Sequence, residues 1–160
     1  MDLETRAGFY NLICITGIPG TGKTTLCKML SDRGISCTGL DCIAEISGAK
    51  DDDIVDVDKL YGVHIESDIV ESHYSHFLNC NHVIILVEDE KTLHARLKTR
   101  GYSDDKINEN IDSQRAEIIY YEALERLPAG RIHIIHEKSR SIEDIYNDVV
   151  SIISRVKEEK

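Results

Sequence analysis

The sequence predicts an α/β protein of three layers, in which helices cover both faces of a five-stranded parallel sheet. Short apolar runs of strand length alternate along the chain with longer stretches of helical period, and this alternation is typical of such a sheet. The chain has 160 residues, of which 41% are hydrophobic and 30% are charged. This size suits a single domain over residues 1–160 and is too small for two independent ones.

The apolar runs locate the strands. They are expected at Tyr10–Thr16, Ile35–Thr38, Asp68–Glu71, His82–Val87 and Arg131–His136. The second and third runs are shorter and more polar than the others. Their alternation with helical stretches is what predicts parallel pairing.

Helices are expected at Lys23–Arg33, Glu90–Thr99, Asp104–Leu127 and from Ser141 to the C-terminus. Start and stop signals support these limits. Ser141 with Asp144 has the pattern of a capping box, and Gly34 and Gly130 lie just past helix ends. Pro128 cannot continue a helix, so the long third helix is expected to end before it.

The segment Gly39–Ser67 shows no clear period. Its middle contains the closely spaced acids Asp51, Asp52, Asp53, Asp56 and Asp58. Like charges this close repel one another and favour an exposed, mobile insertion.

A phosphate-binding loop is predicted at Gly17–Thr24, where GIPGTGKT matches the pattern GxxxxGK[ST] at every fixed position. The string follows an apolar strand and opens a helix, as the mechanics of this loop require. Backbone that wraps a triphosphate must point several N–H groups inward, and Gly20 and Gly22 allow this because they lack Cβ. The sequence therefore predicts the P-loop NTPase version of the α/β fold, with ATP and Mg²⁺ as its ligands.

Each residue of this loop has an expected contact. The cradle itself is expected to consist of Pro19, Gly20, Thr21 and Gly22. Lys23 would reach the β- and γ-phosphates, and the Thr24 hydroxyl would ligate Mg²⁺. Thr25 would face the α-phosphate, although an ordinary position on the helix surface explains this residue as well.

A second element on the metal side is predicted at Asp68–His73, an apolar strand that ends in an acid. A parallel sheet delivers the ends of its strands to one edge, so Glu71 is expected beside the P-loop, where it would orient Mg²⁺ through water. Asp is more usual in this role, and a surface Glu is the competing interpretation. His73 would position or polarise the attacking group near neutral pH, and His76 is the weaker candidate. Ordinary hydrogen bonding explains either ring as well.

A lid is predicted around Arg96–Tyr102, where Arg96 and Arg100 stand one helical turn apart just before Gly101. A glycine can act as a hinge, and planar guanidinium groups suit the equatorial oxygens of a phosphoryl group in transfer. Arg100 is the principal catalytic candidate and an expected ATP contact, and Arg96 is the second catalytic candidate. Lys106 and Arg115 are reserves, since exposed helix charges explain both.

The charge balance limits the partners. With a formal net charge of −10, the chain is not expected to bind nucleic acid strongly, because the phosphates would be repelled. A basic protein partner fits this charge, as does simple solubility. No apolar run is long enough to cross a bilayer, and the first residues lack the features of an export signal, so a cytoplasmic protein without membrane contact is expected.

Cysteine usage points to reduced thiols. The cysteines are Cys14, Cys27, Cys37, Cys42 and Cys80. Their number is odd and no CxxC pair occurs, so neither a disulfide framework nor a zinc site is expected.

Three segments together resemble one family. GIPGTGKTTL, DIVESHYSHF and RLKTRGYSDDKINENI are similar to the adenylate-kinase-6-like family, also called coilin-interacting nuclear ATPases, and the chain looks like an archaeal-type member. The P-loop alone identifies only a superfamily, whereas the acid-x-His after the third strand and the lid pattern are more specific. The resemblance spans most of the chain.

The resemblance implies a nucleoside-monophosphate-kinase-like fold with a short lid over about residues 99–109, and weak, broad adenylate kinase and ATPase activity. It also implies a role in maturing the small ribosomal subunit and its rRNA, with a basic ribosomal protein as partner, in the cytoplasm or, in a eukaryote, the nucleus. Residues 39–54 would be the insertion that binds the monophosphate. ATP contacts are implied for Gly20, Gly22, Lys23, Thr24, Thr25 and Arg100.

The acceptor side departs from the family's eukaryotic pattern, in which an arginine follows the aspartate after the second strand. Here Asp41 is followed by CIAE, and no arginine lies between Arg33 and Arg96. A monophosphate there would have to rely on Lys50, backbone groups or lid arginines. Glu71 likewise stands where the eukaryotic relatives have Asp.

Three functions remain open at this point. The first is transfer of a phosphoryl group from ATP to AMP or another nucleoside monophosphate. The second is an assembly factor in which ATP hydrolysis times the release of a basic ribosomal protein, and the first two do not exclude each other. The third is a P-loop kinase of another small metabolite, in which Asp41 would hold the acceptor hydroxyl.

Overall fold

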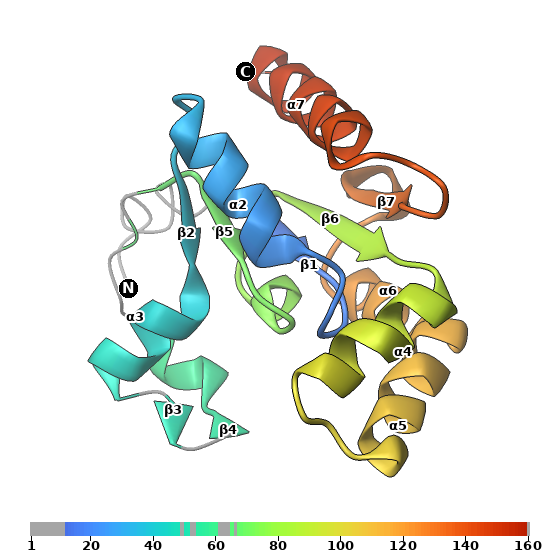
Figure 1. The fold of residues 1–160 in the computed structure, drawn as a ribbon. Coiled ribbons are helices and arrows are strands. Elements are labelled where there is room, and N and C mark those ends of the chain that lie inside the picture. The colour runs from blue at the N-terminus through green and yellow to red at the C-terminus, as the bar shows by residue number, and fades with distance from the viewer. Residues whose placement is uncertain (1–11, 49, 52–53, 61–64, 66, 160) are drawn as a thin grey trace.

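The computed structural model describes residues 12–48, 50–51, 54–60, 65 and 67–159. Its main sheet has five parallel strands in the order β2-β5-β1-β6-β7, which confirms the predicted fold class (Figure 1). The strands are β1 (Ile13–Thr16), β2 (Cys37–Gly39), β5 (Ile69–Glu71), β6 (His82–Val87) and β7 (Ile132–His136). Tyr10 and Asn11, which begin the first predicted strand, lie outside the described residues.

Helices cover both faces of this sheet (Figure 1). They are α2 (Lys23–Asp32), α3 (Leu40–Ser47), α4 (Glu90–Thr99), α5 (Asp104–Arg115), α6 (Ile118–Leu124) and α7 (Ile142–Glu158). α2 and α7 pack on one face, where Ile13 and Ile15 of β1 are buried among their side chains. α3 and α6 pack on the other face, which receives Cys14. Successive strand residues point to opposite faces, and β1 therefore contributes to both cores.

Local signals set several helix ends as predicted. Ser141 accepts a hydrogen bond from the amide of Asp144 and the Asp144 carboxylate accepts one from the amide of Ser141, so the predicted capping box is confirmed. Ser103 caps α5 and Asp89 caps α4 in the same way, each through its side-chain oxygen. None of the helices within the described residues is long and apolar enough to cross a membrane.

The single helix predicted at Asp104–Leu127 is wrong, because two helices occupy that range. α5 ends at Arg115 and α6 begins at Ile118, and between them Glu117 has a left-handed φ of 53°. Packing explains the break. α5 buries Ile107 and Ile111 against α4, whereas α6 buries Ala123 on the sheet, and one straight helix cannot satisfy both. Gly130 consequently lies in a short 3-10 helix (Ala129–Arg131) rather than at the end of an α-helix.

The expectation of an exposed, mobile insertion at Gly39–Ser67 is corrected in part, because some of this segment has regular structure and packs on the core. The described part of this segment contains α3, an antiparallel pair β3 (Lys50–Asp51) and β4 (Ile54–Val55), and a 3-10 helix at Val57–Leu60. Leu40, Ala44 and Leu60 are buried in the core. Asp56 and Asp58 are exposed as expected, whereas Asp52 and Asp53 lie outside the described residues.

The expectation of reduced thiols is contradicted for four of the cysteines. Cys14 pairs with Cys80 and Cys27 with Cys37, with Cα–Cα distances of 6.0 and 5.3 Å, and Cys42 is free and exposed. The pairs join β1 to the chain before β6, and α2 to β2. Only the folded chain brings these residues together, so their spacing in the sequence gave no sign of it.

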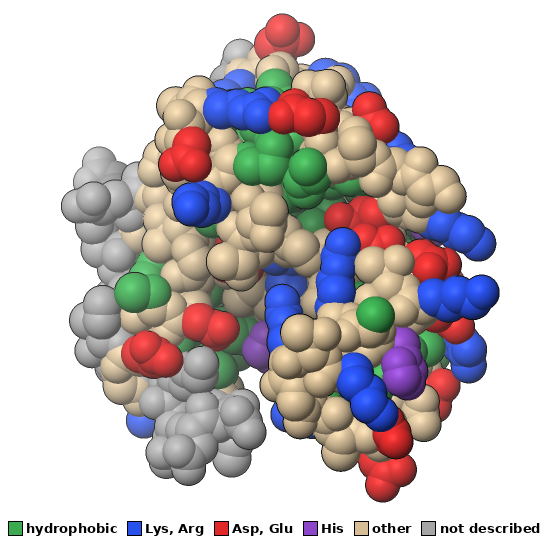
Figure 2. All heavy atoms as spheres, viewed as in Figure 1, with side chains coloured by type: hydrophobic (Ala, Val, Ile, Leu, Met, Phe, Trp, Pro, Cys, Tyr) green, Lys and Arg blue, Asp and Glu red, His purple; other side chains and the backbone are tan. Residues whose placement is uncertain are grey.

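Two arms flank the carboxyl end of β1 (Figure 1). We call residues 40–60, with α3, β3 and β4, the α3 arm, and residues 90–115, with α4 and α5, the α4–α5 arm. The space-filling view shows a hollow between the arms, with Lys and Arg side chains on its wall (Figure 2). The sheet therefore presents the end of β1 at the floor of an open site.

Candidate functional site

The predicted phosphate-binding loop connects the end of β1 to the start of α2 and lies between the two arms. It turns at Gly20 and Gly22, whose φ angles of 93° and 86° lie in the left-handed region. Side chains rarely tolerate these angles. A Cβ at Gly20 would also lie 3.3 Å from Leu93 and Leu97 of α4. The two glycines are therefore required by the turn itself.

The backbone amides of this loop are available to a ligand. Among the described residues, no hydrogen bond is donated by the amides from Gly20 to Thr25. α2 begins there without a side-chain cap and without an acidic residue in its first turn. Unpaired amides at the positive end of a helix dipole form a ready site for an anion.

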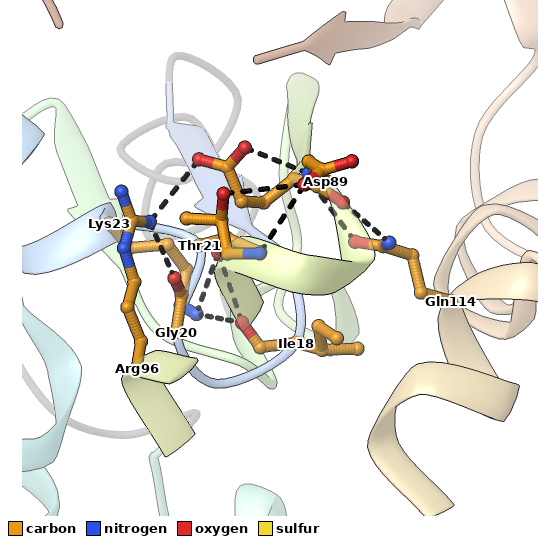
Figure 3. Close-up of polar contacts among 9 residues, drawn as sticks. Ile18, Gly20, Thr21, Lys23, Asp89, Arg96 and Gln114 are labelled. Carbon is orange, nitrogen blue, oxygen red and sulfur yellow. Dashed lines mark hydrogen bonds and ion pairs between the residues drawn. The ribbon is translucent and has the colours of Figure 1, made fainter. Parts of the chain in front are cut away.

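The ammonium group of Lys23 lies inside the loop (Figure 3). Its Nζ donates to the carbonyl oxygens of Gly17 and Ile18, each at 2.9 Å, and to the Thr21 hydroxyl at 3.3 Å. Lys23 is only 8% exposed, and this burial lowers the pKa of its ammonium group to about 8. An anion placed on the neighbouring amides would favour the charged form of this lysine.

Thr24 and Glu71 place two hard oxygens beside the loop. Glu71 ends β5 and pairs in register with Ile15 of β1, which brings the carboxylate next to α2. The Thr24 hydroxyl donates to Glu71 Oε1 at 3.4 Å. Burial raises the pKa of Glu71, with Lys23 opposing the rise. Hydroxyl and carboxylate oxygens are ligands that Mg²⁺ accepts, so the residues present fit that ion. No cluster of three or more metal-binding His, Cys, Asp or Glu side chains occurs in the described part of the chain.

The two candidate histidines differ in their surroundings. His73 is exposed, with its ring edge against Tyr74, and it faces the cavity described below. His76 is buried, and its Nδ1 and Nε2 lie 2.9 Å from Thr16 Oγ1 and 3.2 Å from Glu122 Oε1. Burial lowers the pKa of His76 to about 4, so the ring is neutral and donates from Nε2 to Glu122 while Nδ1 accepts from Thr16. His76 is thus a structural link between β1 and α6.

The predicted lid arginines also differ. Arg100 is the exposed C-cap of α4, and its charge helps to lower the pKa of Lys23, so it lies within electrostatic reach of the loop. Arg96 donates to the carbonyl oxygen of Gly20 at 2.8 Å and to Glu88 Oε2 at 3.2 Å (Figure 3). Gly101, predicted as a hinge, has a left-handed φ of 83°. The reserve Arg115 is bound to Glu90, and the reserve Lys106 lies over the ring of Tyr102.

Two further residues, Pro19 and Thr25, were expected to contact ATP. Pro19 is half-buried, and Thr25 is exposed on the first turn of α2. Neither has a described side-chain partner that would show its role. Their contacts with ATP, like the metal and catalytic roles above, stay predictions.

Sequence reasoning missed two buried acids at the same edge of the sheet. Glu88 follows β6 and Glu137 follows β7, just as Glu71 ends β5. Burial and the charge of Glu88 raise the pKa of Glu137 to about 8, and its Oε2 has no hydrogen-bond partner among the described residues. A Cβ added at Gly22 would lie 3.8 Å from Glu137 Oε1. The signal that selected Glu71, an acid at a strand end, would have found both.

A cavity of about 340 Å³ opens beside the loop between the two arms. Its apolar wall includes Val55, Phe77 and Ile119, and its polar groups include His73 and Asn110. None of its described lining residues is Lys or Arg. A second cavity, of about 250 Å³, lies behind the start of the loop between β6, β7 and the junction of α5 with α6.

Fold and loop geometry together define this chain as a P-loop protein of the α/β class. Residues 13–117 match the model of a family described as AAA domain. A protein of Thermoplasma acidophilum named "Putative adenylate kinase" is 47% identical over 146 residues, which cover 89% of this chain and 97% of the relative. A protein of the same name from Thermoplasma volcanium is 41% identical, over 93% and 98% of the two chains.

The chain therefore belongs to the AAA domain family and, within it, to the archaeal proteins that carry the name "Putative adenylate kinase". Among solved structures, shikimate kinase from Bacteroides thetaiotaomicron is similar in fold, with a TM-score of 0.60 at 19% identity over 89% of this chain and 97% of that one. This likeness concerns the fold alone. The narrower resemblance to coilin-interacting nuclear ATPases stays a prediction.

Proposed function

We propose that this protein is an ATP-dependent nucleoside monophosphate kinase of the adenylate kinase type that also hydrolyses ATP. The observation that carries the proposal is the P-loop, in which the amides from Gly20 to Thr25 donate no hydrogen bond among the described residues and the ammonium of Lys23 lies inside the same loop. Amides and ammonium together match the charge of a triphosphate. The name shared by the archaeal relatives supports a nucleotide as the substrate.

In the proposed reaction, an oxygen of the acceptor attacks the γ-phosphorus of ATP, and the bond from that phosphorus to the β-phosphate oxygen breaks to release ADP. The chain contributes position and charge rather than a covalent intermediate. Lys23 holds the β- and γ-phosphates, and Arg100 stabilises charge on the phosphoryl group in transfer. His73 orients the acceptor, because its ring faces the cavity next to the loop. Arg96 is a second candidate for stabilising the charge on the phosphoryl group in transfer.

Magnesium would be held by the Thr24 hydroxyl directly and by Glu71 through water, since these oxygens lie 3.4 Å apart beside the loop. When bound, the ion supplies positive charge to the phosphate oxygens. Glu71 orients that site because β5 is fixed against β1 by parallel pairing.

The acceptor, AMP or another nucleoside monophosphate, would occupy the cavity of about 340 Å³ between the arms. Its apolar wall suits a base, and the lid over residues 99–109 would close from the α4–α5 arm. No arginine lines the cavity among the described residues, so the phosphate would be held by lid arginines and backbone amides.

A cellular role in maturing the small ribosomal subunit, in the cytoplasm, goes with this proposal. It is supported by the resemblance of the three sequence segments and by the net charge of −10, which suits a basic ribosomal protein. ATP hydrolysis would then time the release of that partner. Copurification with a small-subunit protein, lost on addition of ATP, is the expected result, and a complex indifferent to ATP contradicts this role.

A kinase of another small metabolite is the alternative. The observation that favours it is Asp41, which follows β2 beside the loop and accepts a hydrogen bond from the Tyr74 hydroxyl at 3.0 Å. A carboxylate there is suited to an acceptor hydroxyl and opposes an acceptor phosphate.

One experiment separates these functions. Purified protein is incubated with ATP and Mg²⁺, with and without AMP, and the nucleotides are resolved. The adenylate kinase reaction is identified by two ADP per ATP consumed, formed in the presence of AMP and without release of inorganic phosphate. ADP and inorganic phosphate without AMP identify hydrolysis, and the absence of both reactions contradicts the proposal.

A further inference from the structure

Glu88 is joined to the backbone of the P-loop by Arg96 of the α4–α5 arm, which is drawn beside Gly20 in Figure 3. It lies directly after β6 and is 9% exposed. Its Oε2 accepts a hydrogen bond from Arg96 at 3.2 Å, and the same guanidinium nitrogen donates to the carbonyl oxygen of Gly20 at 2.8 Å. Arg96 is therefore a bridge from a buried carboxylate to one peptide group of the loop.

The position of Glu88 is itself fixed. Its Oε1 accepts from the amide of Asp89 at 2.8 Å. The side chain of Gln114 in α5 accepts from the amide of Glu88 at 3.1 Å and donates to its carbonyl at 2.9 Å. A carboxylate held at so many points cannot follow Arg96 if the arginine moves, so it selects one place for the guanidinium.

The contact with Gly20 determines the direction of a phosphate ligand. The Gly20 carbonyl and the Thr21 amide belong to one trans peptide unit, so the C=O and the N–H point in opposite directions. Because Arg96 holds the Gly20 oxygen at 2.8 Å, the Thr21 amide of the same peptide unit points away from Arg96. That amide is one of the unpaired donors of the cradle.

Glu137 lies near the same groups, but no hydrogen bond joins it to Arg96 among the described residues. Burial and the charge of Glu88 raise the pKa of Glu137 to about 8, so near neutral pH this carboxyl mostly carries a proton. Its Oε2 is buried without a partner among the described residues. The carboxyl group that accepts a hydrogen bond from Arg96 is that of Glu88.

We infer that Glu88 is a positioning residue of the P-loop, which acts through Arg96 and the Gly20 carbonyl to aim the Thr21 amide at the phosphates. The inference rests on the proposed function in one respect, that the loop binds a nucleoside triphosphate. In this inference Arg96 acts on the backbone of the P-loop, whereas a lid arginine would contact the substrate.

The test compares Glu88→Gln with the matched control Glu90→Gln in the full chain. Glu90 is a partly exposed acid two positions away, bound to Arg115 instead of to the loop. Calorimetric titration with ATP is expected to give a dissociation constant about tenfold higher for Glu88→Gln and an unchanged one for the control. At saturating ATP, turnover of Glu88→Gln should stay within about threefold of the wild type, since the chemistry is not touched.

Arg96→Lys is the second variant, and it also covers the case in which Glu88→Gln does not fold. Arg96 is 45% exposed in its side chain, and both of its contacts use one nitrogen of the planar guanidinium, whose position a shorter lysine side chain does not reproduce. We expect about tenfold weaker ATP binding in Arg96→Lys, and no further loss when Glu88→Gln is added, because both changes remove one bridge.

Three outcomes are distinct. Wild-type protein that binds no ATP overturns the proposed function itself. Normal wild-type binding with an unchanged Glu88→Gln overturns only the inference about Glu88. Losses that multiply in the double variant, or a turnover loss confined to Arg96→Lys, assign Arg96 to the substrate and also overturn the inference.

Discussion

The two arms beside the P-loop differ in charge. The α3 arm, residues 40–60, contains seven acids and two lysines, whereas the α4–α5 arm, residues 90–115, contains six Lys or Arg residues and five acids. The basic side chains Arg96 and Arg100 come from the second arm, and Asp41 comes from the first. In the proposed function, the phosphates would therefore be held from the α4–α5 arm, and the α3 arm would select the acceptor by shape and hydrogen bonding rather than by positive charge.

The largest loss is expected from Lys23→Ala, which removes the only side-chain cation inside the loop as far as the structure is described. Turnover of ATP should fall on the order of a thousandfold, because a fixed positive charge at the phosphates is lost. Steady-state assays measure the loss, and circular dichroism checks the fold. Lys91→Ala, on the exposed surface of α4, is the control. Full activity of Lys23→Ala would remove the P-loop from the mechanism.

Arg100→Ala tests the basic arm more selectively. We expect turnover to fall about a hundredfold with ATP affinity changed by less than about threefold, because the arginine acts on charge that develops during transfer. Separate measurements of kcat and of ATP binding by calorimetry decide the point. Lys98→Ala, one of the exposed cations of α4, serves as the control. Equal losses in both quantities would make Arg100 a simple anchor for ATP.

Glu71→Gln tests the metal side of the loop. The half-saturating Mg²⁺ concentration should rise about tenfold, since a neutral amide orients the metal's water less strongly than a carboxylate. A magnesium titration at fixed ATP measures this shift. An unchanged titration excludes Glu71 from the metal site.

Asp41→Asn tests the α3 arm, and it separates a nucleoside monophosphate from a metabolite hydroxyl as the acceptor. If the acceptor is a nucleoside monophosphate, removal of one repelling charge should lower the KM for AMP about fivefold. The Tyr74 hydroxyl can still donate to the amide oxygen, so the local structure is retained. Collapse of activity in this variant, in place of a lower KM, would assign Asp41 to an acceptor hydroxyl and favour the other kinase reaction.

Below both arms, His76 should leave a signature in stability rather than in rate. Its folded pKa of about 4 lies below the ordinary 6.5, so the unfolded chain binds the proton more readily between these values. Stability from this group is present above pH 6.5 and is lost as the pH falls, by about 1.4 kcal/mol per pH unit down to about 4.

Denaturant unfolding of wild type and His76→Gln over this pH range measures the effect as a difference. Glu137 has the opposite influence, because its raised pKa favours the folded state at lower pH, but it is common to both proteins and cancels. Parallel pH profiles of the two proteins would show that His76 does not titrate as described.

The accuracy of sequence reasoning also differs between the arms. The P-loop can be predicted from the sequence because a strand, glycines and a helix start lie within one short segment. The strand ends and α4 can be predicted from their own apolar patterns. α3 is not predicted, although Leu40 and Ala44 have helical spacing, because this apolar pattern is short and is followed by closely spaced aspartates. The break at Glu117 and the two cysteine pairs depend on packing between distant segments, for which no local signal exists.

Site residues show the same limit. Lys23, Thr24 and Glu71 could be placed from the sequence because topology alone brings strand ends and loop together. The bridge through Glu88 could not be foreseen, because it depends on the rotamer of Arg96 and on Gln114, which lies 26 residues from Glu88. Roles that need a bound substrate, including those of His73 and Arg100, remain predictions.

Contact between α4 and the turn at Gly20 restricts how the enzyme can open. Leu93 and Leu97 are fully buried and lie so near Gly20 that a Cβ there would come within 3.3 Å of either. Swinging α4 as a whole would pull these leucines out of the core, at a cost of roughly 2 to 3 kcal/mol each. Gly101, by contrast, has open space around its Cα. If residues 99–109 act as the proposed lid, substrate exchange would need movement only of the short stretch beyond Arg100, and the P-loop would keep its conformation throughout the catalytic cycle.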